Sequence, residues 1–180
     1  MNDKVMLDLY CGRGGWTRGF QAHGFTCYGF DIDSQFRGVY PGTFIRCDIL
    51  KLTLKMLREL KPRVGCASSP CEEFTRHRMP WTRRRNPPPP TLGVRLAHEA
   101  SRIASGLGVP LIFENVLMAQ EWLGPAVMYI GPFYFWGDGI PGIWPHEISR
   151  RVKESYTSAD HAKRAEIPFE IAEGFARYYA

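Results

Sequence analysis

Short apolar runs alternate with helical patterns along most of the chain, and this alternation restricts the fold more than any other feature. Strands and helices in alternation form a mostly parallel sheet with helices on both faces. The aromatic residues 131–145, rich in Gly and Pro, are expected to hold one or two further short strands. The expected parallel strands cover residues 4–10, 25–33, 43–49, 63–69 and 109–116, and the expected helices cover residues 16–24, 52–60, 92–107 and 167–179.

The length of 180 residues suits one α/β domain with one sheet. The sequence contains no internal repeat and no clear linker, so residues 1–180 are expected to form a single domain. Residues 76–90 are basic and end in four prolines, which exclude a helix there and predict a loop. Hydrophobic residues make up 44% and charged residues 23%, a composition typical of soluble globular proteins.

The charge and the cysteines suggest a class of partner and a compartment. A net charge of +5 favours an anionic partner such as nucleic acid. We expect no membrane contact and a cytoplasmic location, because the sequence shows no apolar leader and no apolar run of spanning length. Five irregularly spaced cysteines indicate free thiols. Cys66, Cys71 and His77 lack a fourth ligand at a familiar spacing, so no metal site is expected, and no obligate protein partner is evident.

A glycine-rich turn follows the first expected strand. Gly12 and Gly14 lie between this strand and a helix, where glycine lets the backbone approach a ligand closely. Asp31 follows about twenty residues later, where a carboxylate accepts hydrogen bonds from ribose hydroxyls. Thr17 stands where a dinucleotide fingerprint has its third glycine, which disfavours NAD. The pattern favours a nucleoside-bearing cofactor, and the alternative is that Asp31 only caps the following turn.

Chemically active residue types recur at the carboxyl ends of the expected strands. Glycines follow the first strand, Asp31 ends the second and Asp48 the third. Cys71 follows the fourth strand and Glu114 lies near the end of the fifth. The carboxyl ends of parallel strands meet at one edge of a sheet, and ligands bind there. We therefore expect these residues to share one rim.

Three motifs along this rim resemble the DNA (cytosine-5) methyltransferase family. Residues 10–14 (YCGRG), 70–71 (PC) and 114–116 (ENV) stand in the family's order, and the resemblance covers residues 5 to about 120. The chain looks like a small phage-type member. The resemblance implies a Rossmann-like S-adenosylmethionine-dependent methyltransferase fold, one methyltransferase-like catalytic domain, and S-adenosyl-L-methionine as cofactor. The cofactor-binding residues that it implies are Asp8, Tyr10, Gly12, Gly14, Gly15, Trp16, Asp31, Ile32, Asp48, Ile49 and Pro70.

The same resemblance implies that Cys71 and Glu114 are catalytic. Carbon 5 of a pyrimidine is a poor nucleophile, and addition of a thiolate to carbon 6 makes it reactive towards a donor methyl group. Cys71 would be this thiolate, with Arg76 or Arg78 lowering its pKa. Glu114 would hydrogen-bond ring nitrogen 3 and the exocyclic amine, and a base such as water would remove the carbon 5 proton. The alternative is an inert buried thiol and a salt-bridged carboxylate.

The basic segment after Cys71 is expected to contact nucleic acid. Arginines neutralise phosphates, Trp81 is suited to stacking on a base, and the family has a mobile loop here that closes over a flipped base. The alternative is a solvated loop whose arginines pair with Glu72 and Glu73. The expected substrate-binding or nucleic-acid-binding residues are Arg76, Arg78, Trp81, Arg83, Arg84, Arg85, Asn115, Arg150 and Arg151.

The chain departs from the family pattern in several places. Glu72 stands where the family has glutamine, and together with Glu73 it would raise the pKa of the thiol unless paired. Only residues 117–180 follow the last motif, so a target-recognition region is expected to be missing. Residues 146–154 loosely replace a Gln-x-Arg-x-Arg motif. Residues 164–175 replace a Gly-Asn motif and are expected to pack against the cofactor turn.

Three hypotheses about function follow. The first is a minimal cytosine-5 methyltransferase of low sequence specificity that acts on DNA, in a host cytoplasm if it is phage-encoded. The second is an enzyme that modifies cytosine in free nucleotides or RNA. The third is a nucleic-acid-binding protein with a relict cofactor site. Arg13 in the cofactor turn also leaves open a carboxylated form of the donor.

Overall fold

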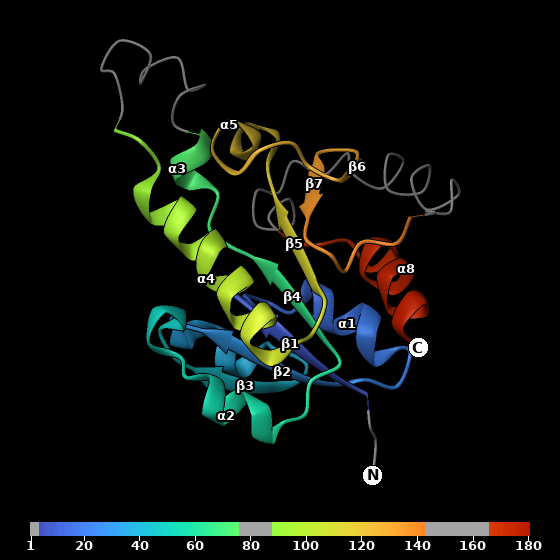
Figure 1. The fold of residues 1–180 in the computed structure, drawn as a ribbon. Coiled ribbons are helices and arrows are strands. Elements are labelled where there is room, and N and C mark those ends of the chain that lie inside the picture. Colours follow the sequence, from blue (N-terminus) through green and yellow to red (C-terminus); the bar gives the residue numbers. More distant parts are fainter. Residues whose placement is uncertain (1–3, 76–87, 143–165) are drawn as a thin grey trace.

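A mixed sheet of seven strands runs through the computed structural model (Figure 1). The structure describes residues 4–75, 88–142 and 166–180. The strands are β1 (Val5–Leu9), β2 (Thr26–Asp31), β3 (Thr43–Arg46), β4 (Val64–Ser68), β5 (Leu111–Asn115), β6 (Met128–Ile130) and β7 (Phe133–Trp136). Their order is β3-β2-β1-β4-β5-β7-β6. Pairing is parallel from β3 to β5, whereas β7 runs antiparallel to both of its neighbours.

Helices cover both faces of this sheet (Figure 1). On one face lie α1 (Gly15–Gln21) and α8 (Phe169–Tyr179), and on the other lie α2 (Leu54–Glu59) and α4 (Thr91–Leu107). The other elements of the described residues are short, namely α3 (Glu72–Thr75), α5 (Gln120–Leu123) and the 3-10 turns η1 (Ser34–Gly38), η2 (Ile49–Lys51) and η4 (Leu117–Ala119).

The expected α/β architecture is confirmed, and each of the predicted parallel strands is present. The strand expected in residues 131–145 is β7; residues 143–145 lie outside the described part of the chain. β6 was not predicted, because three residues carry too little periodicity to mark a strand. The helix expected from residue 92 begins at Thr91, directly after the last proline of the loop.

Two apolar cores lie on opposite faces of the sheet, because alternate residues of a strand point to opposite sides. On β4, Cys66 belongs to the core under α1 and α8, and Ala67 belongs to the core under α2 and α4. On β5, Ile112 and Phe113 divide in the same way. Strands buried on both faces are apolar throughout, so they appear in the sequence as continuous runs without alternation.

The last helix packs closely on the helix that follows the glycine-rich turn. A Cβ atom at Gly15 would lie 2.7 Å from the carbonyl oxygen of Ile167. A Cβ atom at Gly19 would overlap the backbone of Ala172 and Glu173. The expectation that the C-terminal segment packs against the cofactor turn is therefore confirmed for the part of that segment that the structure describes.

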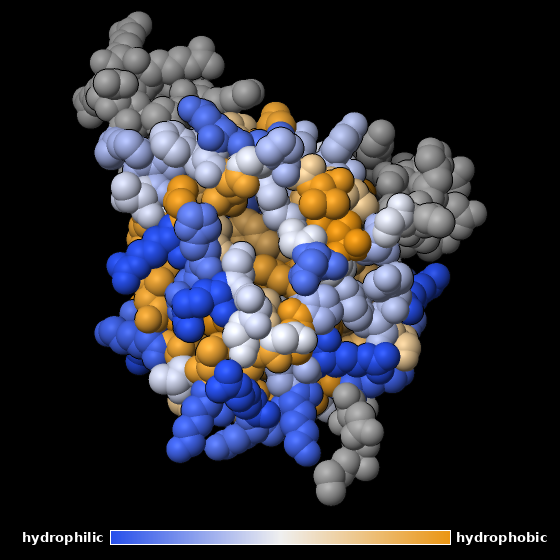
Figure 2. Space-filling model, in the orientation of Figure 1, coloured by the Kyte–Doolittle hydropathy of each residue, from blue (hydrophilic) through white to orange (hydrophobic). Residues whose placement is uncertain are grey.

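The surface differs between the two ends of the sheet. Over α2 it is mainly hydrophilic (Figure 2), with Lys55, Arg58 and Glu59 exposed. In the described residues, no helix is long and apolar enough to span a membrane. An apolar recess of about 100 Å³ lies between α4, α5 and β5, and its lining includes Ala97, Phe113, Leu123 and Trp136. Neither region contains the residues that the three motifs single out.

Replacing Gly19 with alanine tests the contact between α1 and α8. Alanine in a helix is favoured over glycine by about 1 kcal/mol, but overlap with a packed backbone costs about 2 kcal/mol or more. We expect Gly19→Ala to lower the free energy of unfolding measured in urea. Gly38→Ala is the control, since a Cβ atom there meets nothing within 4 Å. Equal stability of the two variants would contradict the close packing.

Candidate active site

The strand order reverses between β1 and β4. The chain proceeds from β1 outwards to β2 and β3, and then returns to the other side of β1 as β4. Such a reversal leaves a crevice at the carboxyl ends of the two strands, where open α/β sheets bind ligands. A cavity of about 240 Å³ lies there, and we name it the β1–β4 cavity. It is lined by Tyr10, Cys11, Gly12, Arg13, Gly15, Trp16, Phe36, Ser68, Glu166 and Ile167.

The glycine-rich turn forms one wall of this cavity and requires left-handed backbone. Gly12 and Gly14 have φ angles of 49° and 83°, and Tyr10 has a φ angle of 60°, which is uncommon for a residue other than glycine. The Asp31 carboxylate holds the turn in place. It accepts hydrogen bonds from the backbone amides of Gly12 at 3.0 Å and Asp33 at 2.9 Å. Asp31, predicted to bind ribose, therefore supports the cavity wall from β2.

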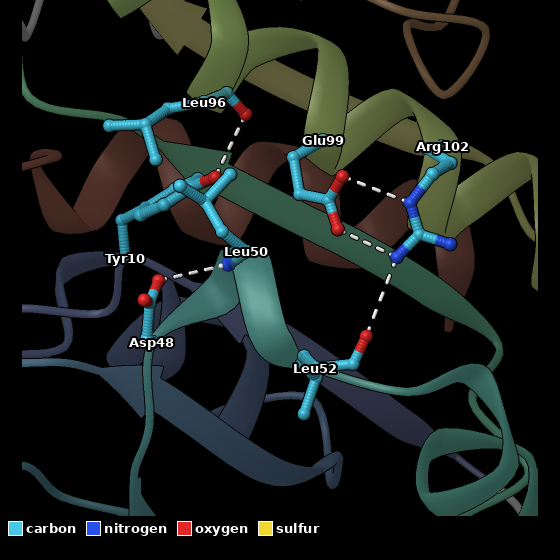
Figure 3. Close-up of polar contacts among 7 residues, drawn as sticks. All are labelled: Tyr10, Asp48, Leu50, Leu52, Leu96, Glu99 and Arg102. Atoms are coloured by element: carbon cyan, nitrogen blue, oxygen red, sulfur yellow. Dashed lines mark hydrogen bonds and ion pairs between the residues drawn. The ribbon is translucent and has the colours of Figure 1, made fainter. Parts of the chain in front are cut away.

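Tyr10 and Asp48 both make hydrogen bonds to backbone groups near this wall (Figure 3). The Tyr10 hydroxyl donates a hydrogen bond of 2.8 Å to the carbonyl oxygen of Leu96 on α4. The Asp48 carboxylate accepts one of 3.0 Å from the backbone amide of Leu50, and it thereby caps η2. Asp48 does not line the β1–β4 cavity, so the cavity walls give no support to its predicted contact with the cofactor.

Asp8 lies inside the protein, beneath the turn. Its side chain is 1% exposed, accepts a hydrogen bond of 2.8 Å from the Thr17 hydroxyl, and lies 3.4 Å from the Tyr40 hydroxyl. Burial raises the pKa of this carboxyl from 3.8 to about 7. The carboxyl faces Thr17 on α1 and Tyr40, and Asp8 does not line the β1–β4 cavity, so the cavity walls give no support to its predicted contact with the cofactor.

The other predicted cofactor residues divide between the cavity and its surroundings. Tyr10, Gly12, Gly15 and Trp16 line the β1–β4 cavity. Ile49 does not line it, since it is 3% exposed within the core under α4. The predicted residues that also lie outside the cavity lining are Gly14, Asp31, Ile32, Asp48 and Pro70.

Sequence reasoning did not assign Cys11, Phe36, Ser68, Glu166 and Ile167 to the site, although all of them line the cavity. Phe36 lies in a 3-10 turn that no local pattern marks. Glu166 and Ile167 belong to the segment 164–175, which was expected to pack against the cofactor turn but was not assigned to the cavity lining. Ser68 did have a signal, because it ends a strand that borders the reversal in strand order.

The second part of the site lies at the ends of β4 and β5. Ser68 pairs with Glu114 in the parallel register of these strands, and Cys71 follows three residues after Ser68. The Asn115 amide donates hydrogen bonds to the Ser69 carbonyl oxygen at 3.0 Å and to the Ser69 hydroxyl at 3.2 Å. Asn115 is 1% exposed and fastens the two strand ends together, and its contact with substrate stays a prediction.

The electrostatics of Cys71 and Glu114 are linked. Burial and the carboxylates of Glu72 and Glu114 raise the pKa of the Cys71 thiol from 9.0 to about 11. Burial also raises the pKa of Glu114 from 4.5 to about 7, against the opposing effect of a hydrogen bond with Ser68. At neutral pH the thiol is therefore mostly protonated, and Glu114 is divided between its two forms.

The two glutamates after Cys71 have different surroundings. Glu73 accepts a hydrogen bond of 2.8 Å from the backbone amide of Gly93, in the first turn of α4. Phe74, which follows, is 1% exposed and anchors α3. Glu72 is exposed, and its negative charge raises the pKa of Cys71. Glu73 therefore stabilises the contact between α3 and α4, whereas Glu72 raises the pKa of the Cys71 thiol.

The predicted basic contacts fall outside the described residues. These are Arg76, Arg78, Trp81, Arg83, Arg84, Arg85, Arg150 and Arg151. Their roles stay predictions. Within residues 4–75, 88–142 and 166–180, no group of three His, Cys, Asp or Glu side chains is arranged to hold a metal ion.

Known proteins resemble this chain in fold. No family model and no curated protein matches the sequence. A prophage-encoded E. coli protein described as a DNA modification methyltransferase is 17% identical, with a TM-score of 0.52, over 67% of this chain and 34% of that one. The methyltransferase EhMeth of Entamoeba histolytica is 17% identical, with a TM-score of 0.50, over 67% of this chain and 40% of that one. The Dnmt2 methyltransferase of S. pombe is 14% identical, with a TM-score of 0.50, over 87% and 57% of the two chains.

These similarities establish the class of fold. The matched region covers less than two thirds of each of those proteins. The chain has a Rossmann-like methyltransferase fold, and one of these structural neighbours is named as a DNA modification methyltransferase.

The influence of Glu72 on Cys71 predicts a change in thiol reactivity. Removing a negative charge lowers the pKa of a nearby thiol and increases its thiolate fraction at pH 8. We expect Glu72→Gln to speed alkylation of Cys71 about two- to threefold at low salt, and less at high salt. Peptide mass spectrometry distinguishes Cys71 from the other cysteines. Glu73→Gln, which keeps an acceptor for Gly93, should leave the rate unchanged; equal rates for Glu72→Gln and the native protein would refute the prediction.

Asp8 predicts that stability depends on pH. A carboxyl whose pKa is raised by folding binds more protons in the folded state, so its contribution is present below about pH 4 and is lost as the pH rises to about 7. Asp8→Asn removes this loss. Relative to the native protein, we expect Asp8→Asn to gain up to about 4 kcal/mol of unfolding free energy between pH 4 and pH 8. Urea unfolding of both proteins measures the difference, and a constant difference across this range would be the contrary result.

Proposed function

We propose that this protein transfers a methyl group from S-adenosyl-L-methionine to carbon 5 of cytosine, with DNA as the substrate. The observation that carries the proposal is the arrangement of Cys71 and Glu114. They lie at the ends of two paired strands, close enough that Glu114 raises the pKa of the Cys71 thiol. The β1–β4 cavity lies directly beside them, since Ser68 belongs both to its lining and to the register pair with Glu114.

The β1–β4 cavity suits this donor chemically. Tyr10, Trp16 and Phe36 provide aromatic surface for the adenosine part. Arg13 and Glu166 provide opposite charges that match the carboxylate and the ammonium of its methionine part. When bound there, the donor supplies an electrophilic methyl group.

Cys71 and Glu114 would divide the remaining chemistry. The Cys71 thiolate would bond to carbon 6, and the electron pair of the 5,6 double bond would move to carbon 5. Carbon 5 would then bond to the methyl group as the methyl–sulfur bond of the donor breaks, with its electron pair left on sulfur. The carbon 5 proton then passes to a base such as water, and the carbon–sulfur bond breaks to restore the double bond. Glu114, with a pKa of about 7, is partly protonated at neutral pH and can donate to ring nitrogen 3, which offsets the charge that builds up on the ring.

The thiol needs further activation. A pKa of about 11 leaves little thiolate at neutral pH, so a cation must approach Cys71 when substrate binds. Arg76 and Arg78, five and seven residues further along the chain, are the proposed source. The same segment would contact phosphates, in keeping with the net charge of +5.

A mechanism-based experiment tests this function. Purified protein is incubated with labelled donor and cytosine-containing DNA, and 5-methylcytosine is measured by mass spectrometry. We expect Cys71→Ala to abolish transfer and Glu114→Gln to reduce it by about 100-fold. Cys47→Ala, which changes a partly buried thiol outside the lining of the cavity, should retain activity. DNA with fluorine at carbon 5 of cytosine should form a stable covalent adduct with the native protein, because fluorine does not leave as a proton does.

The outcomes separate the three functional hypotheses. Full transfer by Cys71→Ala would exclude the covalent mechanism. Transfer to cytosine nucleotides or RNA but not to DNA would reassign the substrate. DNA binding without calorimetric binding of S-adenosyl-L-methionine would indicate a nucleic-acid-binding protein with a relict site.

A further inference from the structure

A chain of hydrogen bonds leads from the β1–β4 cavity to Glu114. The indole N–H of Trp16 donates to the Ser68 hydroxyl at 2.9 Å. The Ser68 hydroxyl is in turn hydrogen-bonded to the Glu114 carboxyl, and this bond favours the charged form. An indole nitrogen only donates, so the hydroxyl oxygen accepts from Trp16 and the hydroxyl proton is left for Glu114.

The start of this chain is rigidly held. Trp16 is 2% exposed and packs edge-to-face against Phe135, at a ring distance of 6.3 Å, and against Phe175, at 5.6 Å. Phe135 also faces Glu114 across the β5–β7 pair, so the same aromatic ring restricts the movement of both the Trp16 and the Glu114 side chains. Trp16 can therefore fix the direction of the Ser68 hydroxyl.

The end of the chain depends on Ser68. The parallel register sets Ser68 beside Glu114, with both side chains on the face of the sheet that carries Trp16. Among the described residues, Ser68 is the one side chain that hydrogen-bonds the Glu114 carboxyl. A partly buried carboxyl with a single partner takes its orientation from that partner.

We propose that Ser68 is a positioning residue for Glu114, and that Trp16, Ser68 and Glu114 form a connection between the wall of the β1–β4 cavity and the group that faces the substrate. Ser68 itself touches neither the reacting carbon nor its proton. The assignment of Glu114 to the substrate rests on the proposed function, whereas the hydrogen-bond chain does not. A substitution at Trp16, on the cavity side, should therefore change the pKa of Glu114.

Other groups around Glu114 can also affect its titration, and the experiment must distinguish their effects from that of Ser68. Cys71, from the segment after β4, is its titratable neighbour, and on β7 the facing residue is the non-ionisable Phe135. Arg13 and Glu166 are the charged side chains in the cavity wall beyond Ser68. Titrations should therefore also be recorded in a Cys71→Ser background, in which this neighbour does not ionise.

The test is an NMR titration of the free protein with carbon-13 in its glutamate carboxyls. Loss of one signal in Glu114→Gln assigns Glu114. We expect Ser68→Ala to raise the titration midpoint of Glu114 by about one pH unit, because it removes a hydrogen bond to the charged form. Ser68→Thr keeps the hydroxyl and should restore the native midpoint. Trp16→Phe, which keeps an aromatic ring and removes the N–H, should shift the midpoint in the same direction by a smaller amount.

Catalysis supplies a second measurement. Ser68→Ala should lower kcat about tenfold and move the pH–rate profile with the Glu114 titration, and Ser68→Thr should recover both. An unchanged Glu114 midpoint in Ser68→Ala would overturn the proposal, as would equal shifts in Ser68→Ala and Ser68→Thr. If Ser68→Ala does not fold, a native midpoint in Trp16→Phe would overturn it as well. The titration needs neither donor nor cytosine, so its failure is distinct from a failure of Cys71→Ala to lose transfer.

Discussion

The parallel pairing of β4 with β5 decides where Cys71 and Glu114 lie. Its backbone hydrogen bonds set Ser68 beside Glu114, and Asn115 adds a side-chain link to Ser69 at the ends of the strands. A slip of one residue would turn Glu114 to the opposite face, away from Trp16 and the β1–β4 cavity. The position of Cys71 follows from the same pairing, because it comes directly after the fastened strand end.

The glycine-rich turn depends on polar groups that lie behind it. Its left-handed backbone includes Tyr10, whose conformation is unfavourable for a residue with a side chain. Hydrogen bonds from the turn to Asp31 and from Tyr10 to Leu96 offset that strain. A buried carboxyl at Asp8 adds a further unfavourable feature below the turn. The cavity wall thus contains backbone and side-chain conformations that are unfavourable on their own, and the surrounding packing stabilises them.

Much of the fold and part of the site could be predicted from the sequence. Strand positions follow from apolar runs, and the rule that ligands bind at the carboxyl ends of parallel strands predicts the edge of the sheet at which the β1–β4 cavity lies. The roles of Glu73 and Asn115 could not be predicted, because each depends on a partner in another element. The same holds for Ser68, whose partners are Trp16 and Glu114. Sequence motifs identify which residue types lie at the strand ends. The three-dimensional pairing decides which of these side chains hold the structure together and which are left to contact a ligand.

The hydrogen bond between Glu73 and the Gly93 amide joins the two sides of the segment that separates them. It closes a loop of chain just beyond Cys71, and the folded residues at the two ends of that loop offset the entropy lost in closing it. Insertions or deletions between these two residues can therefore change the length of the loop without moving Cys71 or the first turn of α4. In evolutionary terms, a base fastened in this way lets the segment change in length while the strand ends beneath it stay fixed.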